Sequence, residues 1–178
     1  HSGTVYATAY SNGDYEYAGA AGTVVQRSSS QLKGTLRIVK NQVGGLIPTK
    51  IFNTDPLFDA YLVEYGRAEF GVGGDFVLNN GVTFTINTSG TVDIANGSDF
   101  TLKPGSTFNI GTTSSNGYDY WPILNIGNSN IFKVENGALF SPTWKSYINN
   151  IGTGTFDTSE LNNLTLATTY TTNYTATT

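Results

Sequence analysis

The chain has 178 residues, of which 12% are charged, 38% hydrophobic and 13% aromatic, with a net charge of -4. The apolar share is large enough to form a core and excludes a disordered chain, while the negative charge argues against a nucleic-acid partner. Cysteine is absent and histidine occurs once, which excludes disulfides, thiolate metal sites and catalytic centres that need a cysteine or two histidines.

Two further features of the composition favour an extracellular protein. Methionine is absent, so we expect a processed chain whose mature N-terminus is His1 and whose secretory signal has been removed. No apolar run approaches the roughly 18 residues of a transmembrane helix, so we expect no membrane span. Sparse charge with abundant Thr, Asn, Ser and Gly is typical of microbial surface proteins.

Residues 1–13 are predicted to form an N-terminal arm ahead of a single β-rich domain at 14–163. The arm alternates small apolar residues with Thr and Tyr, a pattern suited to an extended strand, and a turn at 11–14 supplies a hinge. We expect such an arm to add itself to the sheet of a neighbouring subunit. Its candidate contact residues are Val5, Tyr6, Ala7, Ala9 and Tyr10.

The next predicted elements are strands at 35–40 and at 46–47 with 51–52, and then one short helix at 55–66. Asp55 is the expected N-cap, Pro56 the first helical residue and Gly66 the C-terminal stop. Apolar residues then recur at helical spacing, which suggests a helix packed across an end of the β core. They are Leu57, Phe58, Tyr61, Leu62 and Tyr65.

Carboxylates gather around this predicted helix, at Asp55, Asp59, Glu64 and Glu69. They match no calcium-loop spacing, so we interpret them as solvated caps, with a Ca²⁺ site as the alternative and no other cofactor. No pair of carboxylates elsewhere is marked as a glycosidase acid and nucleophile, so we expect no enzymatic activity.

Residues 77–111 contain the strongest signal, an eight-residue repeat. Apolar residues recur in two frames and all carry even numbers, which places them on one face of extended chain. Outward positions fall between them at Thr85, Asp93, Thr101 and Asn109, and turns recur at Gly81, Gly97 and Gly105, with Gly90 displaced by one. The predicted core residues are Leu78, Phe84, Ile86, Val92, Ile94, Phe100, Leu102, Phe108 and Ile110.

Two all-β architectures fit this period. In a β-solenoid each unit is one side of a coil and like residues stack along the axis; in an antiparallel meander each unit is one hairpin arm. The repeat resembles the Gly-punctuated repeats of β-helical passenger regions in bacterial adhesins, which favours the solenoid. The frame resumes at 131–139, where Phe132 and Val134 are the predicted inward pair and Asn136-Gly137 the turn.

Aromatic residues interrupt the repeat and give an alternative function. Side chains such as these stack on sugar rings, and neighbouring Asp and Asn groups bind hydroxyls, so a carbohydrate-binding adhesin module is one interpretation. The other is that the tryptophans cap the core. The candidate stacking residues are Tyr118, Tyr120, Trp121 and Trp144.

Residues 164–178 are rich in Thr and contain no Gly, Pro or charge, which predicts a second strand-like arm, with Leu164 and Leu166 as its apolar residues, or a frayed tail. Four Asn-x-Ser/Thr sequons are candidate glycosylation sites. They are Asn87, Asn96, Asn163 and Asn173, of which the first two fall at turns of the repeat.

Together these features predict a structural subunit of an extracellular filament or surface appendage. In overall character the chain resembles archaeal filament subunits of the thread type, and this resemblance implies glycosylation and assembly by donor-strand exchange. The expected partners are copies of the chain itself and surface glycans. The alternatives are a carbohydrate-binding adhesin module and a virion fibre or decoration protein.

Overall fold

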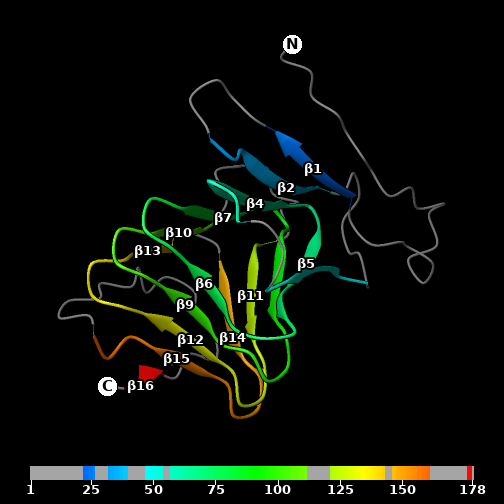
Figure 1. Ribbon diagram of the computed structural model, residues 1–178. Coiled ribbons are helices and arrows are strands. Elements are labelled where there is room, and N and C mark those ends of the chain that lie inside the picture. The colour runs from blue at the N-terminus through cyan, green and yellow to red at the C-terminus, as the bar shows by residue number, and fades with distance from the viewer. Residues whose placement is uncertain are drawn as a thin grey trace.

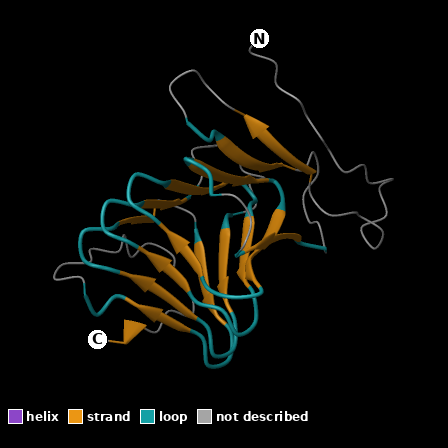
Figure 2. Ribbon diagram, in the orientation of Figure 1, coloured by secondary structure: helices purple, strands orange, loops and turns teal. Residues whose placement is uncertain are grey.

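The protein is all-β and is built from three sheets (Figures 1 and 2). The computed structural model describes residues 22–26, 32–39, 47–53, 57–111, 121–142, 146–160 and 176–177. Within these ranges no helix occurs, and hence none that is long and apolar enough to cross a membrane.

The three sheets form the sides of a solenoid, because the chain visits them in turn. Sheet A holds β1 (Gly22–Gln26), β2 (Thr35–Val39), β4 (Ala60–Glu64), β7 (Thr83–Asn87), β10 (Thr107–Ile110) and β13 (Leu139–Pro142). Sheet B holds β3 (Thr49–Phe52), β5 (Arg67–Val72), β8 (Thr91–Ile94), β11 (Ile123–Ile126) and β14 (Tyr147–Asn150). Sheet C holds β6 (Phe76–Leu78), β9 (Phe100–Leu102), β12 (Ile131–Val134), β15 (Thr155–Asp157) and β16 (Ala176–Thr177).

Parallel pairing distinguishes the solenoid from the meander. Among the described strands, only β1 and β2 pair antiparallel, and all other neighbours are parallel. Strands of one sheet recur after one full coil, 23 residues from Tyr61 to Phe84 and 24 from Phe84 to Phe108. Each eight-residue unit is therefore one side of a three-sided coil.

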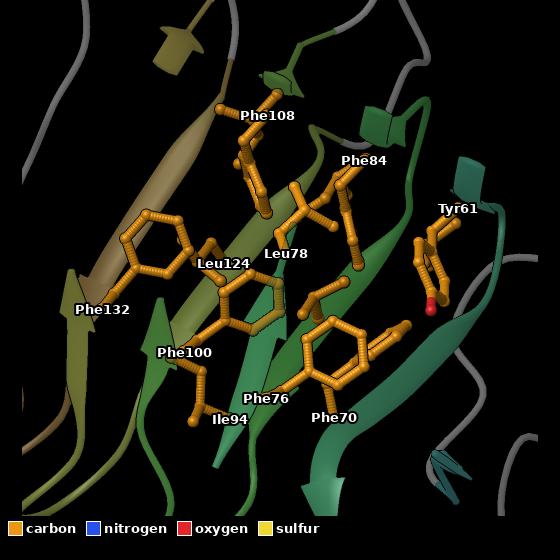
Figure 3. Packing of buried hydrophobic residues seen from close by; sticks show 14 of the residues in the cluster. Tyr61, Phe70, Phe76, Leu78, Phe84, Ile94, Phe100, Phe108, Leu124 and Phe132 are labelled. Carbon is orange, nitrogen blue, oxygen red and sulfur yellow. The ribbon is translucent and has the colours of Figure 1, made fainter. Parts of the chain in front are cut away.

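Like residues stack from coil to coil inside the solenoid (Figure 3). On sheet A, Phe84 lies 4.9 Å from Phe108 between ring centroids, and the rings are nearly parallel. On sheet C, Phe100 stacks on Phe132 at 5.3 Å. Because the two ladders also meet edge to face, as between Phe84 and Phe100, the aromatic rings fill the interior where the sheets converge.

The predicted core of the repeat is confirmed. All nine even-numbered apolar residues from Leu78 to Ile110 are buried in one cluster. The four intervening residues, Thr85, Asp93, Thr101 and Asn109, face outward and are half-exposed. The resumption is confirmed too, because Phe132 and Val134 are fully buried and a turn follows at 136–137.

Corner residues in the left-handed conformation set the eight-residue period. They have positive φ and stand eight apart, so each marks the end of one side. The series runs Tyr65, Gly73, Gly81, Ser89, Gly97 and Gly105, and it continues at Ser129 and Gly137. Glycine adopts this conformation at no steric cost, which explains the three glycines that share a frame in the repeat.

Gly90 lies one residue outside this series for a different reason. Ser89 takes the left-handed position, and Gly90 follows where two coils approach closely. A Cβ on Gly90 would clash with the carbonyl oxygen of Val63 and lie 2.8 Å from that of Asn87. The displaced glycine is therefore required by close backbone packing and not by its φ angle.

Replacing Gly90 with Ala is expected to cost about 2 kcal/mol in the free energy of unfolding, because the clashing atoms belong to the backbone. The matched variant Gly97→Ala has open space around the new Cβ and costs only the left-handed strain, about 1 kcal/mol. Urea unfolding of both variants measures the difference. A Gly90→Ala protein more stable than Gly97→Ala would contradict the close approach.

The predicted helix at 55–66 is wrong. Asp55 and Pro56 lie outside the described residues, and Ala60–Glu64 forms strand β4, paired on both sides by β2 and β7. Tyr61 and Val63 are buried while Leu62 between them faces out. Aromatic and β-branched residues suit a strand, and two neighbouring strands outweigh a local apolar spacing that also fits a helix.

Other predicted elements vary in outcome. The strand at 35–40 is confirmed as β2, whereas the predicted pair around 46–52 is a single strand, β3, with Ile47 and Pro48 ahead of it. The N-terminal arm lies outside the described residues. Of the C-terminal arm, Ala176–Thr177 forms β16 and pairs with β15 of the same chain.

Candidate functional site

A hollow of about 250 Å³ opens on the outer face of sheet B, where the strands run into the turns that lead to sheet C. We call it the sheet B hollow. Strands β5, β8 and β11 contribute its central side chains, and the turns after β8 and β11 contribute two amides. The polar lining comprises Arg67, Glu69, Asp93, Asn96, Asn125 and Asn128.

The strand residues face this hollow because alternate side chains point inward. Ala68, Val92 and Leu124 are fully buried, so their neighbours in sequence project to the outer face. Parallel register then aligns Glu69 with Asp93, and Asp93 with Asn125. Three polar side chains from three coils thus form one row across the sheet.

Asp93 is held from both sides. Arg67 donates from Nε and Nη2 to the Asp93 carboxylate, at 2.5 and 3.0 Å, and Asn125 Nδ2 donates to Oδ1 at 2.8 Å. Asn149 continues the row by donating to Asn125 Oδ1 at 3.0 Å. Hydrogen bonding to Asp93 raises the pKa of Arg67, so this charged pair is a fixed part of the site.

Other polar groups of the hollow keep hydrogen-bonding capacity. Within the described part of the chain, the side chains of Glu69 and Asn96 have no hydrogen-bond partner, and Asn128 uses its Oδ1 to accept from the Thr153 amide. One cation, Arg67, stands against two anions, Glu69 and Asp93, which leaves a formal charge of -1. The arrangement is suited to a ligand that both donates and accepts hydrogen bonds.

An aromatic pair lies on the same sheet. Tyr147, the first residue of β14, has the outward parity, and its ring stacks on Trp121 with centroids 4.6 Å apart. Both residues keep partial exposure. Of the predicted sugar-stacking residues, Trp121 is thus placed beside Tyr147, while Tyr118, Tyr120 and Trp144 lie outside the described residues.

The predicted acidic cluster is dispersed by the fold. Asp59 and Glu64 lie at opposite ends of β4 on sheet A, whereas Glu69 lies on sheet B. Glu64 pairs with Arg37 at 3.5 Å, and Asp59 receives hydrogen bonds from backbone amides. In the ranges that the structure describes, no group of three potential metal-ligating side chains occurs, and the proposed Ca²⁺ alternative gains no support.

Asp59 is expected to titrate below its ordinary range. The amides of Gly34 and Lys33 donate to its carboxylate at 2.9 and 2.7 Å, and these bonds lower the pKa of Asp59. Because the folded-state value is depressed, their stabilisation is present above the unfolded-state pKa of about 3.9 and is lost as pH falls through the folded value. An NMR titration of the carboxyl carbon measures the shift.

The same titration in urea provides the reference for Asp59. We expect the native midpoint to lie below that of the unfolded chain. Equal midpoints would show that the two amides do not hold the carboxylate in solution.

Two of the four sequons lie in the described part of the chain, and they differ in accessibility. Asn96 is an exposed turn residue, whereas Asn87 is half-buried and donates to Glu64 Oε1 at 3.1 Å. Glycosylation of either stays a prediction. Asn163 and Asn173 lie outside the described residues.

Sequence reasoning missed the sheet B hollow. It placed Asp93 correctly on the outer face but assigned Glu69 to the acidic cluster and gave no role to Arg67 or Asn125. The signal was available in the period, because Glu69 and Asp93 are 24 residues apart, which is one full coil. Without the number of sides, that spacing has no meaning.

The ends of the solenoid expose a second feature, the strand edges. Among the described strands, β13 pairs only with β10, and β6 only with β9. Leu139 in β13 is 57% exposed at this edge, and Pro142 ends the strand without an amide donor. An edge with free backbone groups accepts a further strand.

The chain matches no protein-family model, and no curated protein or solved structure shows significant similarity to it. The features available for a functional argument are therefore its own: a three-sided rod of parallel strands, exposed strand edges, and one polar hollow on an outer face.

Proposed function

We propose that this protein is a structural subunit of an extracellular filament or surface appendage, and that subunits join by adding a strand of one copy to a sheet of the next. The observation that carries the proposal is the edge of β13, at one end of sheet A. Its inner residue Phe140 ends the aromatic ladder, and its outer residue Leu139 is exposed.

A strand added to β13 would satisfy backbone groups along that edge and cover Leu139. The N-terminal arm has the composition for this role, since Val5, Ala7 and Ala9 would continue the row of inward side chains beyond Phe140. Ten extended residues reach roughly 33 Å, enough to cross one side of a neighbouring coil. The occupant that we propose is therefore the arm of a second copy.

Uncontrolled edge-to-edge association is opposed by the sequence. Pro142 limits the hydrogen bonds that β13 offers, and Lys50 places a charge on β3 at the edge of sheet B. Natural sheets use proline and lysine at edges to prevent random aggregation. A specific arm combined with protected edges favours ordered assembly.

Deleting residues 1–10 is expected to give folded subunits that do not polymerise. Electron microscopy and sedimentation show the assembly state, and circular dichroism confirms that β structure is retained. Normal filaments from the truncated chain would exclude the N-terminal arm as the inserted strand.

Leu139→Lys tests the accepting edge independently, because lysine at an edge strand opposes strand addition. We expect shorter or no filaments. Ile131→Lys is the matched control, since Ile131 is also an exposed apolar residue but lies on β12, which is paired on both sides. Equal filament formation by the two variants would contradict a role for the β13 edge.

A further inference from the structure

We propose that the sheet B hollow binds one ring of a neutral polysaccharide. The proposal does not depend on assembly. It starts from the free hydrogen-bonding capacity of Glu69, Asn96 and Asn128, which combine a carboxylate acceptor with amide groups that both donate and accept. Adjacent hydroxyl groups of a sugar ring need both kinds of partner at short separation.

The charge of the hollow selects against an anionic ligand. Arg67, its cation, is committed to Asp93 through two hydrogen bonds, and the carboxylate of Glu69 remains in front of the ligand. An acidic sugar, a phosphate or a sulfate would meet a site of formal charge -1. A neutral ring avoids this repulsion and still receives the full set of hydrogen bonds.

The site is rigid before the ligand arrives. Asp93 is fixed by Arg67 and Asn125, and Asn125 by Asn149. Side chains held in this way lose little conformational entropy on binding, which raises affinity for a weakly interacting polar ligand.

Apolar surface completes the match. Pro48 and the half-exposed Ile151 border the hollow and can contact the C–H groups of a ring. The stacked pair of Trp121 and Tyr147 lies two residues before Asn149 along the strand, roughly 7 Å away, where it would contact the next ring. A volume of about 250 Å³ lies below the range of about 300–1,000 Å³ for drug-sized ligands, which fits one ring of a longer chain.

Binding is measured with soluble tetrasaccharides of neutral hexoses, cellotetraose and mannotetraose, and with a hyaluronan tetrasaccharide as the anionic probe. In proton–nitrogen NMR spectra, we expect a neutral probe to shift the side-chain amide signals of Asn96 and Asn128. Glu69→Ala and Asn125→Ala should each weaken binding about tenfold. Asn109→Ala, an outward residue of sheet A that donates to Thr85, should bind as the unmodified chain does.

Three results would overturn the proposal. The first is no amide shift with either neutral probe at about 10 mM, where even a dissociation constant near 1 mM is detected. The second is tighter binding of hyaluronan than of both neutral probes. The third is full binding by Glu69→Ala and Asn125→Ala, with circular dichroism showing that both variants are folded.

Discussion

Replacing Phe100 with Ala is expected to lower the free energy of unfolding by about 4 kcal/mol, a large share of the roughly 5–15 kcal/mol of a typical domain. Phe100 is fully buried where sheet C meets the rings of sheet A. It stacks on Phe132 at 5.3 Å and meets Phe84 and Phe108 edge to face at 5.6 and 5.8 Å. No single neighbour can move to fill the resulting cavity, because each belongs to a ladder of its own.

The adjacent residue supplies the control. Thr101 is half-exposed on the outer face of the same strand, so Thr101→Ala should change stability by less than about 0.5 kcal/mol. Urea unfolding followed by circular dichroism gives both values. A Phe100→Ala loss as small as that of Thr101→Ala would show that the aromatic ladders do not form the core.

Asn130→Ala is expected to cost about 3 kcal/mol, because a fully buried corner amide is removed. Asn130 Nδ2 donates to the carbonyl oxygens of Ile94 and Ala95 at 3.1 and 2.7 Å, and its Oδ1 accepts from the amide of Gly97 at 3.3 Å. The side chain therefore ties one corner to the coil before it. Without it, buried backbone groups lose their partners, each at a cost of about 1–3 kcal/mol.

Two variants separate hydrogen bonding from shape at this corner. Asn130→Asp keeps the shape but places a carboxylate against two carbonyl oxygens, so it should be at least as damaging as Asn130→Ala. Asn136→Ala, at an exposed turn position, should be nearly neutral. If Asn130→Asp were as stable as the unmodified chain, the amide would not donate to these carbonyls.

The fold was predictable where several sides of the coil follow each other without interruption. Residues 77–111 give the side length, the inward face and the turns, and all nine core residues follow from them. The number of sides did not follow, because it depends on the angle of each corner and on which strands pair. Only the recurrence of Phe84 above Tyr61 after 23 residues shows that a coil has three sides.

Residues 55–66 misled for a related reason. Over a single side, Phe58, Tyr61 and Tyr65 satisfy helical spacing as well as Tyr61 and Val63 satisfy a strand. A short apolar run is ambiguous by periodicity alone, and pairing with β2 and β7 decides it. The left-handed Tyr65 then forms a corner where glycine would have been the recognisable signal.

The candidate site was hidden by its distance in sequence. Arg67 and Asp93 are 26 residues apart, and Asp93 and Asn125 are 32 apart. Neither spacing forms a local motif, and the second includes the interruption at 112–120. Such a row becomes visible only when the coil length is known and outward residues are compared from one coil to the next.

The most direct test of the proposed function is electron microscopy of the purified full-length chain over a range of concentrations, with sedimentation of the same samples. We predict unbranched filaments, with an arm of one subunit continuing a sheet of the next in a reconstruction of the filament. A protein that remains monomeric at every concentration would contradict assembly by strand addition, as would filaments whose subunits contact each other without a shared sheet.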